Sequence, residues 1–234
     1  MDAHVLVDHD NVPAQFTKAG LAGLAMRVVS LLDGSIKDLG DLHVRLYGGW
    51  YDASGGLTRV GTRIAQEIGR DFPITKLNQS RQIRRVACEI ASALIDSPQD
   101  LLPFTFRKRP GIRSRLSRVR PPNCIDHSKC SIDAVVAWSR GVCPESGCPV
   151  TPENVFGFYE QKLVDTMLCC DVVALALRNP RAPIVILSDD DDLAPAVLMA
   201  AKLGAPIHLI EMRANKQGTY RPLFTSYNVR TTSL

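Results

Sequence analysis

Long apolar runs are missing from this sequence: none approaches the roughly 20 residues that a membrane-spanning helix needs. Internal repeats and low-complexity segments are also absent. With 28 Lys and Arg against 24 Asp and Glu, the net charge of +4 does not by itself indicate a nucleic-acid partner. The first strand-like segment begins at His4 and leaves no room for a signal peptide, so we expect a soluble cytoplasmic protein without a membrane partner.

What the sequence does contain is an alternation of apolar strands and amphipathic helices. Its 234 residues, 45% of them hydrophobic, suffice for the core of one large domain. Near-continuous apolar strands that alternate with helices are typical of a parallel sheet covered on both faces, so we expect an α/β fold. Segments 73–78 and 85–95 both qualify as the third strand, and the second could equally be a helix. We expect further strands at 4–8, 42–51, 183–189 and 206–212, and helices at 21–34, 57–69, 158–179 and 193–204.

The alternation stops between Pro103 and Pro149, where basic residues, prolines and cysteines replace the periodic apolar residues. It resumes after this segment. We therefore expect one domain formed by residues 1–102 and 150–234, with residues 103–149 as a basic, cysteine-rich insertion.

Acidic side chains stand at the ends of two expected strands. Asp8 ends the first strand, and Asp190 and Asp192 belong to a run of four aspartates that closes a later one. The carboxyl ends of neighbouring parallel strands share one edge of a sheet, where open α/β folds bind ligands. Asp165, on an expected helix, can bring a third acid there. Crowded carboxylates need a cation, and Mg²⁺ or Mn²⁺ would suit this oxygen-only set and activate water for attack on a phosphodiester.

Simpler roles are open to some of these residues. Asp192 stands where an N-cap of the next helix is expected, although a single cap does not explain acids on three segments. Asn11 is a neutral group that can orient a phosphate oxygen or a metal-bound water. Helical spacing places Lys162 and Asp165 on one face and points Asp171 elsewhere.

Three segments together resemble the signature of the PIN-like NYN nuclease family. They are VLVDHDNV at 5–12, EQKLVDTMLCCD at 160–171 and VILSDDDDLAPAV at 185–197. The segment VRLYGGWY at 44–51 also resembles the family's usual tyrosine-glycine-tryptophan strand. The positions that match the signature are Asp8, Asn11, Lys162, Asp165, Asp171, Ser188, Asp190 and Asp192.

This resemblance covers about residues 4–72 and 156–211. It implies a Rossmann-like sheet and either a metal-dependent ribonuclease or an RNA-binding relative of such an enzyme. Leu163 and Asp189 depart from the family pattern where glycine is common, and Leu193 replaces an aromatic residue. None of these departures removes an acidic ligand.

A second enzyme class shares part of the pattern. Asp8 and Asp10 also fit the Asp-x-Asp-x-Val motif of haloacid-dehalogenase-like phosphatases, in which Asp8 would be a covalent nucleophile and Asp10 the acid and base. That interpretation leaves the spacing of Lys162, Asp165 and Asp171 unused. We therefore favour the nuclease.

Four of the seven cysteines cluster within the expected insertion. Cys124 and Cys130 form one pair, and Cys143 and Cys148 form a second pair a dozen residues later. Two ligand pairs at this separation are typical of structural zinc sites. We expect Zn²⁺ bound by the four cysteines, or by three of them and His127.

A run of basic residues without an acid precedes the cysteines. Runs of charge are often solvated surfaces, but arginine suits bidentate contacts with phosphate. We expect this run to hold the backbone of a nucleic acid. Its residues are Arg107, Lys108, Arg109, Arg113, Arg115, Arg118 and Arg120.

A second stretch near the C-terminus interleaves basic residues with aromatic rings that could stack on nucleobases. Such stretches more often pack on their own domain. The residues are Arg213, Lys216, Tyr220, Arg221, Phe224, Tyr227 and Arg230.

These patterns together predict a metal-dependent ribonuclease acting on single-stranded RNA. The preference for RNA over DNA comes from the resemblance alone, so DNA is an alternative substrate. The alternative function is an RNA-binding module of the same fold that does not cleave. Asp8, Asp165, Asp190 and Asp192 are the expected metal ligands, Asn11 positions phosphate or water, and Lys162 neutralises charge or touches the scissile phosphate.

Overall fold

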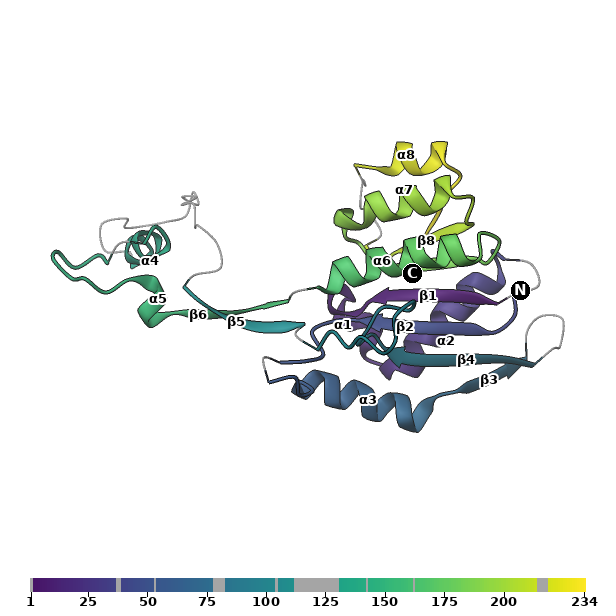
Figure 1. The fold of residues 1–234 in the computed structure, drawn as a ribbon, viewed down its shortest axis with the longest axis horizontal. Helices are drawn as coiled ribbons and strands as arrows, with labels where there is room; N and C mark the ends of the chain where they lie inside the picture. Colours follow the sequence, from purple (N-terminus) through teal and green to yellow (C-terminus); the bar gives the residue numbers. More distant parts are fainter. Residues whose placement is uncertain are drawn as a thin grey trace. The chain divides into compact units, whose positions relative to one another are not determined.

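The computed structural model describes residues 2–36, 39–52, 54–77, 83–103, 105–111, 131–141, 143–161, 163–213 and 219–234. The chain forms two compact units (Figure 1). The large unit consists of Met1–Thr105 and Gln161–Leu234, and the small unit is the segment between them, Phe106–Glu160. Within the described ranges, the helices are all too short or too polar to cross a membrane.

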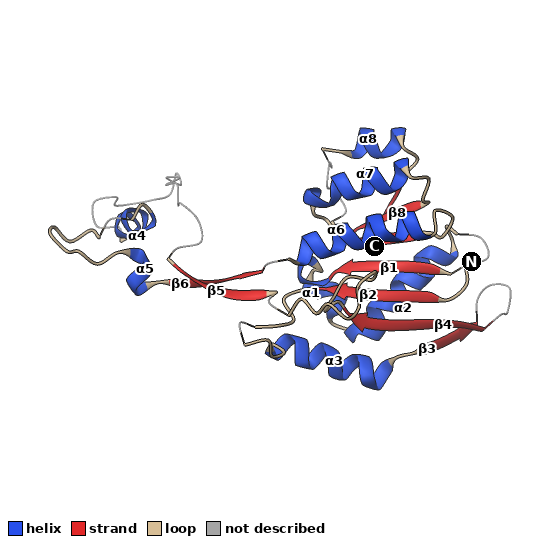
Figure 2. Cartoon of the chain, in the orientation of Figure 1, coloured by secondary structure: helices blue, strands red, loops and turns tan. Residues whose placement is uncertain are grey.

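A seven-stranded sheet forms the centre of the large unit (Figure 2). Its strands are β1 (Ala3–Asp8), β2 (Leu42–Tyr47), β3 (Ile74–Leu77), β4 (Ile83–Ile90), β7 (Ile184–Leu187), β8 (Ile207–Glu211) and β9 (Arg230–Ser233). Their order is β3-β4-β2-β1-β7-β8-β9, and each neighbouring pair is parallel except β3 and β4. The expected α/β fold with a mostly parallel sheet is therefore confirmed.

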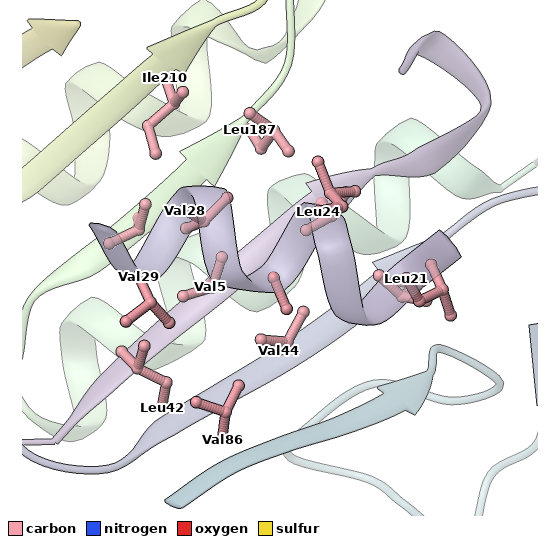
Figure 3. Packing of buried hydrophobic residues seen from close by; sticks show 14 of the residues in the cluster. Val5, Leu21, Leu24, Val28, Val29, Leu42, Val44, Val86, Leu187 and Ile210 are labelled. Carbon is pink, nitrogen blue, oxygen red and sulfur yellow. The ribbon is translucent and has the colours of Figure 1, made fainter. Parts of the chain in front are cut away.

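Helices cover both faces of this sheet. Val5 and Val7 of β1 belong to an apolar cluster that two helices complete, α2 (Gly20–Asp33) and α3 (Arg59–Asp71). Figure 3 shows this cluster, with α2 lying over the sheet. Leu6 points to the opposite face, as the twofold period of a strand requires. The cluster on that face is completed by α6 (Val164–Arg178), α7 (Ala194–Lys202) and α8 (Arg221–Ser226).

Three short elements complete the large unit. They are α1 (Ala14–Thr17) and the 3-10 turns η1 (His9–Asn11) and η2 (Asp191–Leu193). The turns η1 and η2 follow β1 and β7 directly, so each is positioned by the strand before it.

Two expectations about the elements change. The segment expected as one helix at 158–179 is divided: β6 (Gly157–Gln161) precedes α6, which begins at Val164. Leu163 causes the break, because its φ of 69° lies in the left-handed region, which a right-handed helix cannot include. Both candidates for the third strand are strands, and only β4 pairs with β2, while β3 pairs antiparallel with β4.

The small unit is built on a two-stranded sheet of β5 (Phe106–Pro110) and β6. It also contains the short helices α4 (Ile132–Ser139) and α5 (Pro152–Val155). We expected residues 150–160 in the main domain, but here they belong to the small unit, because β6 pairs with β5.

Candidate active site

The strand order places a topological switch point at β1. The chain continues from β1 to β2 on one side, and β7 pairs with β1 on the other side. Open α/β folds bind their ligands beyond the carboxyl ends of the strands at such a point. Asp8 ends β1, and Ser188 and Asp190 follow β7, so these side chains stand at the switch point.

Asp8 is the most enclosed acid of this edge, with 2% of its surface exposed. Its Oδ2 atom accepts hydrogen bonds from the Asn11 amide and the Ser188 hydroxyl, both at 2.7 Å. Burial raises the pKa of Asp8 above its usual value, although these two hydrogen bonds lower it and the nearby charge of Asp190 raises it. The sequence pattern paired Asp8 with Asn11, and the structure brings the two into direct contact.

Ser188 connects the two strands that flank the switch point. Its hydroxyl donates to Asp8 and accepts from the backbone N–H of Asp190 at 3.0 Å. Asp190 in turn accepts from the backbone N–H of Asp192 at 2.9 Å, which caps the η2 turn. Asp192 does not cap the following helix: α7 begins at Ala194 with no side-chain hydrogen bond at its N-cap.

Asp189 has a different role from its neighbours. Its Oδ1 atom accepts from the backbone N–H of Met212 at 2.9 Å, and its Oδ2 atom lies 3.5 Å from Nε of Arg213. Met212 and Arg213 directly follow β8. Asp189 therefore holds the segment after β7 against the segment after β8.

Asp165 lies in the first turn of α6, and that helix contacts both β1 and η2. Desolvation raises the pKa of Asp165, and the charges of Asp8, Asp190, Asp192 and Asp10 raise it further, in that order. Charges act on one another in this way only when they are near. The carboxylates expected from three segments of the sequence therefore meet at one edge of the sheet.

Asp10 joins this edge from η1. Its Oδ2 atom accepts from the backbone N–H of Gly49 at 2.7 Å, which attaches the loop after β2. The adjacent His9 is buried, and its ring lies 5.2 Å from that of Trp50 in the same loop. Asp10 and His9 thus hold the β2 loop beside the acids.

The donor set of this edge consists of carboxylate and amide oxygens, which Mg²⁺ and Mn²⁺ prefer. As they stand, no three His, Cys, Asp or Glu side chains among the described residues form a group that could hold a metal ion. Mg²⁺ keeps several of its waters and takes only one or two carboxylates directly. The chemistry of the donors therefore fits an ion bound partly through water.

Asp171 is buried on α6 and does not belong to the edge, in keeping with its helical position. Its carboxylate accepts from the Tyr47 hydroxyl at 2.6 Å and from the backbone N–H of Ile95 at 2.8 Å, and it lies 3.3 Å from Nε of Arg45. Burial raises its pKa, while these partners lower it. Asp171 therefore fastens α6 to β2 and to the loop after β4.

Arg45 and Tyr47, the partners of Asp171, were not singled out in the sequence. They stand two residues apart on β2 and so point to the same face of the sheet. That spacing was visible in the sequence, but their partner on α6 lies more than 120 residues away along the chain.

The expected RNA-binding residues are only partly described. Lys108 and Arg109 are exposed on β5, and Nε of Arg109 lies 3.1 Å from a carboxylate oxygen of Glu160. Arg107 belongs to the same strand. The remaining expected residues outside the described ranges are Arg113, Arg115, Arg118, Arg120, Lys162, Cys124, His127 and Cys130.

The C-terminal stretch of basic and aromatic residues packs largely on its own unit. Arg221 pairs with the buried Glu211, and Phe224 is buried in the cluster beneath α7 and α8. Arg230 donates to the backbone carbonyl of Ser35 at 2.8 Å. Arg221, Phe224 and Arg230 therefore pack on their own unit, which was the alternative to contact with nucleobases. Lys216 lies outside the described ranges.

Comparison with known protein families, curated proteins and solved structures found no match to this chain.

Proposed function

We propose that the large unit is a metal-dependent nuclease that hydrolyses phosphodiester bonds in single-stranded RNA. The observation that carries this proposal is the placement of Asp8, Asp165 and Asp190 at the switch point, where burial first, and neighbouring carboxylates second, raise the pKa of Asp8 and Asp165. Such crowding disfavours the ionised state unless a cation offsets it. The choice of RNA, and of a PIN-like NYN identity, follows from the resemblance of the three motifs.

Asp8, Asp165, Asp190 and Asp192 would hold Mg²⁺ or Mn²⁺. When bound, the ion supplies the positive charge that activates water for in-line attack and stabilises the leaving oxygen. Asn11 and Ser188 fix the orientation of the Asp8 carboxylate by donating to one of its oxygens. No side chain has to act as a covalent nucleophile.

The basic residues would position the substrate. Lys162 would neutralise charge or touch the scissile phosphate, as the family motif implies. The run from Arg107 to Arg120 would contact backbone phosphates, which orients a nucleic acid without reading its sequence. The exposure of Lys108 and Arg109 on β5 is consistent with this role.

A cleavage assay tests the proposal. Labelled single-stranded RNA is incubated with Mn²⁺ and either wild type, Asp8→Asn or the control Asp100→Asn, which alters an exposed carboxylate outside the acidic edge. We expect wild type and the control to cleave alike, and Asp8→Asn to lose more than about 100-fold in rate, the scale of losing one preorganised electrostatic group. Binding of RNA by all three without cleavage by any would overturn the nuclease and leave the RNA-binding module.

Replacing Asp10 distinguishes the nuclease from the alternative, a haloacid-dehalogenase-like phosphatase. Because Asp10 accepts a hydrogen bond from Gly49, Asp10→Asn keeps an oxygen acceptor and preserves the loop. We expect near-normal RNA cleavage by Asp10→Asn. Hydrolysis of a small aryl phosphate monoester by wild type, abolished in Asp10→Asn, would instead favour the phosphatase.

A further inference from the structure

One face of α3 carries arginines and no acid. Arg59, Arg63 and Arg70 lie within about 40° of one another around the helix axis, because an α-helix turns by about 100° per residue. Thr62 and Gln66 complete this face, and all five residues are exposed. A hollow of about 530 Å³ lies along the first turns of the helix, and its lining includes Arg59, Thr62, Arg63 and Gln66. Since α3 lies on the outside of the large unit (Figure 1), this face is open and cationic.

The nearest acid of α3 leaves two of these arginines available. Glu67 lies on the adjoining side of the helix, and its Oε2 atom accepts from the backbone N–H of Leu21 in α2 at 3.1 Å. Its Oε1 atom is 3.8 Å from Nε of Arg63, whose side chain stays 65% exposed, and such an exposed pair is weak. Arg59 has no ion-pair partner among the residues that the structure describes. A partner can therefore use the positive charges of Arg59 and Arg63.

The loop after β2 joins this face to the acidic edge. The backbone N–H of Gly49 donates to Asp10 at 2.7 Å, and the carbonyl of Gly49 accepts from the Thr58 hydroxyl at 3.1 Å. Thr58 is the N-cap of α3, and its side chain accepts from the backbone N–H of Gly61 at 3.1 Å. A Cβ at Gly61 would lie 2.7 Å from a carbonyl oxygen of this loop, so the first turn packs tightly on it. One loop therefore connects Arg59 to the acids.

We propose that Arg59 and Arg63 hold the phosphodiester backbone of the single-stranded RNA that the acidic edge cleaves, an inference that rests on the proposed function. A guanidinium group donates two parallel hydrogen bonds to a phosphate, which suits this contact. An acidic edge repels a polyanion, so a substrate needs positive charge beside the edge as well as a cation in it. Contacts of this kind orient the strand without reading its bases.

The spacing of the two arginines fits more than one phosphate. Arg59 and Arg63 are one helical turn apart, about 6 Å along the axis, so they can contact different phosphates of the same strand. Thr62 and Gln66 lie on the same face and have side-chain donors for phosphate or sugar oxygens. α3 begins at the loop beside the acidic edge, so a strand bound along it has one end next to the acids.

Binding of RNA without metal tests the proposal. Fluorescence anisotropy measures the affinity of the full-length protein for a fluorescein-labelled oligouridylate in EDTA, so metal-dependent cleavage does not interfere. Arg59→Gln/Arg63→Gln should bind about tenfold more weakly than wild type in about 0.1 M salt. The slope of log affinity against log salt should flatten by about 1.4, because each lost phosphate contact on a single strand contributes about 0.7.

A second double variant is the matched control. Arg85→Gln/Arg181→Gln also removes two exposed arginines from the large unit, but these lie near the start of β4 and just before β7, at the amino ends of the strands. It should bind as wild type does. Arg70 is left unchanged, because its guanidinium already donates to Asp71 at 2.8 Å. Circular dichroism should give the wild-type spectrum for both variants, since all four replaced residues are exposed.

Two results would overturn the role of α3. They are equal affinity and salt slope in the two double variants, and a fall in kcat at unchanged KM when Arg59→Gln/Arg63→Gln cleaves RNA with Mn²⁺. Loss of a backbone contact should instead raise KM and leave kcat nearly unchanged. If Arg59→Gln/Arg63→Gln alone weakened binding but wild type never cleaved, the binding face would be supported and the nuclease would be wrong. The two proposals can therefore fail separately.

Discussion

The two units of this chain are stabilised in different ways. The large unit buries one apolar cluster on each face of its sheet, and its polar groups gather at the strand ends. The small unit buries few of its described residues, and its two strands pair only with each other. A core on each face therefore holds the acidic edge of the large unit in place, whereas the described residues of the small unit belong to neither apolar cluster.

The largest expected effect is a loss of stability in the large unit when Asp171, the buried acid of α6, is replaced. Asp171→Ala leaves the Tyr47 hydroxyl and the Arg45 guanidinium without their shared partner. We expect the free energy of unfolding to fall by about 3–5 kcal/mol, the scale of breaking a buried ion pair. Urea denaturation followed by circular dichroism measures it.

A surface pair serves as the control for this change. Asp96 pairs with Arg178 on the exterior, where both side chains are at least half exposed. Asp96→Ala should cost less than about 1 kcal/mol. Equal losses in the two variants would mean that the contacts of Asp171 do not anchor α6.

A smaller effect concerns pH and the acidic edge. Burial and neighbouring charges raise the pKa of Asp8, and desolvation and neighbouring charges raise that of Asp165, above the ordinary 3.8, so the folded chain holds these protons more tightly than the unfolded chain. Their stabilising contribution is complete below pH 3.8 and is lost as pH rises through the raised pKa values. At pH 7 and without divalent ions, Asp8→Asn should therefore be more stable than wild type, by about 0.5–2 kcal/mol.

Mg²⁺ and acid should each reduce the difference in the free energy of unfolding between Asp8→Asn and wild type. Mg²⁺ offsets the charge of wild type, and acid protonates Asp8 so that it resembles asparagine. Thermal unfolding at pH 4 and pH 7, with and without Mg²⁺, measures both trends. If wild type were more stable than Asp8→Asn at pH 7 without metal, the ionised Asp8 carboxylate would not destabilise the folded chain, and the prediction would be wrong.

The smallest effect concerns the left-handed residue before α6. Leu163→Gly should raise the free energy of unfolding by about 0.5–1 kcal/mol, because leucine at a φ of 69° is strained and glycine is not. Leu177→Gly replaces an exposed leucine inside the same helix and should lower it by about 1 kcal/mol. Thermal unfolding measures the direction of the stability change in both variants. Destabilisation by Leu163→Gly would show that Leu163 is not strained.

The sequence was informative where function depends on local order. Strand ends at Asp8 and Asp190 were visible because apolar runs stop there, and the shared edge of parallel strands placed them together. Helical spacing separated Asp165 from Asp171. These rules need only short stretches of sequence.

Contacts between distant segments were not visible. The partners of Asp171 lie on β2 and after β4, and neither motif nor periodicity links them to α6. The start of α6 was misplaced because the expected helix was extended back to Phe158, whereas a single backbone angle at Leu163 separates α6 from β6. The family that this sequence resembles commonly has glycine at the position of Leu163, and this was the one signal in the sequence for a left-handed residue there.

The Ser188 hydroxyl and the Asp8 carboxylate are separated by 180 positions along the chain. During synthesis β1 leaves the ribosome before β7, and the small unit is made between them. The nascent chain therefore carries Asp8 without Ser188 until the small unit has been made. A cleaving activity at the acidic edge would arise only after β7 has emerged and paired with β1.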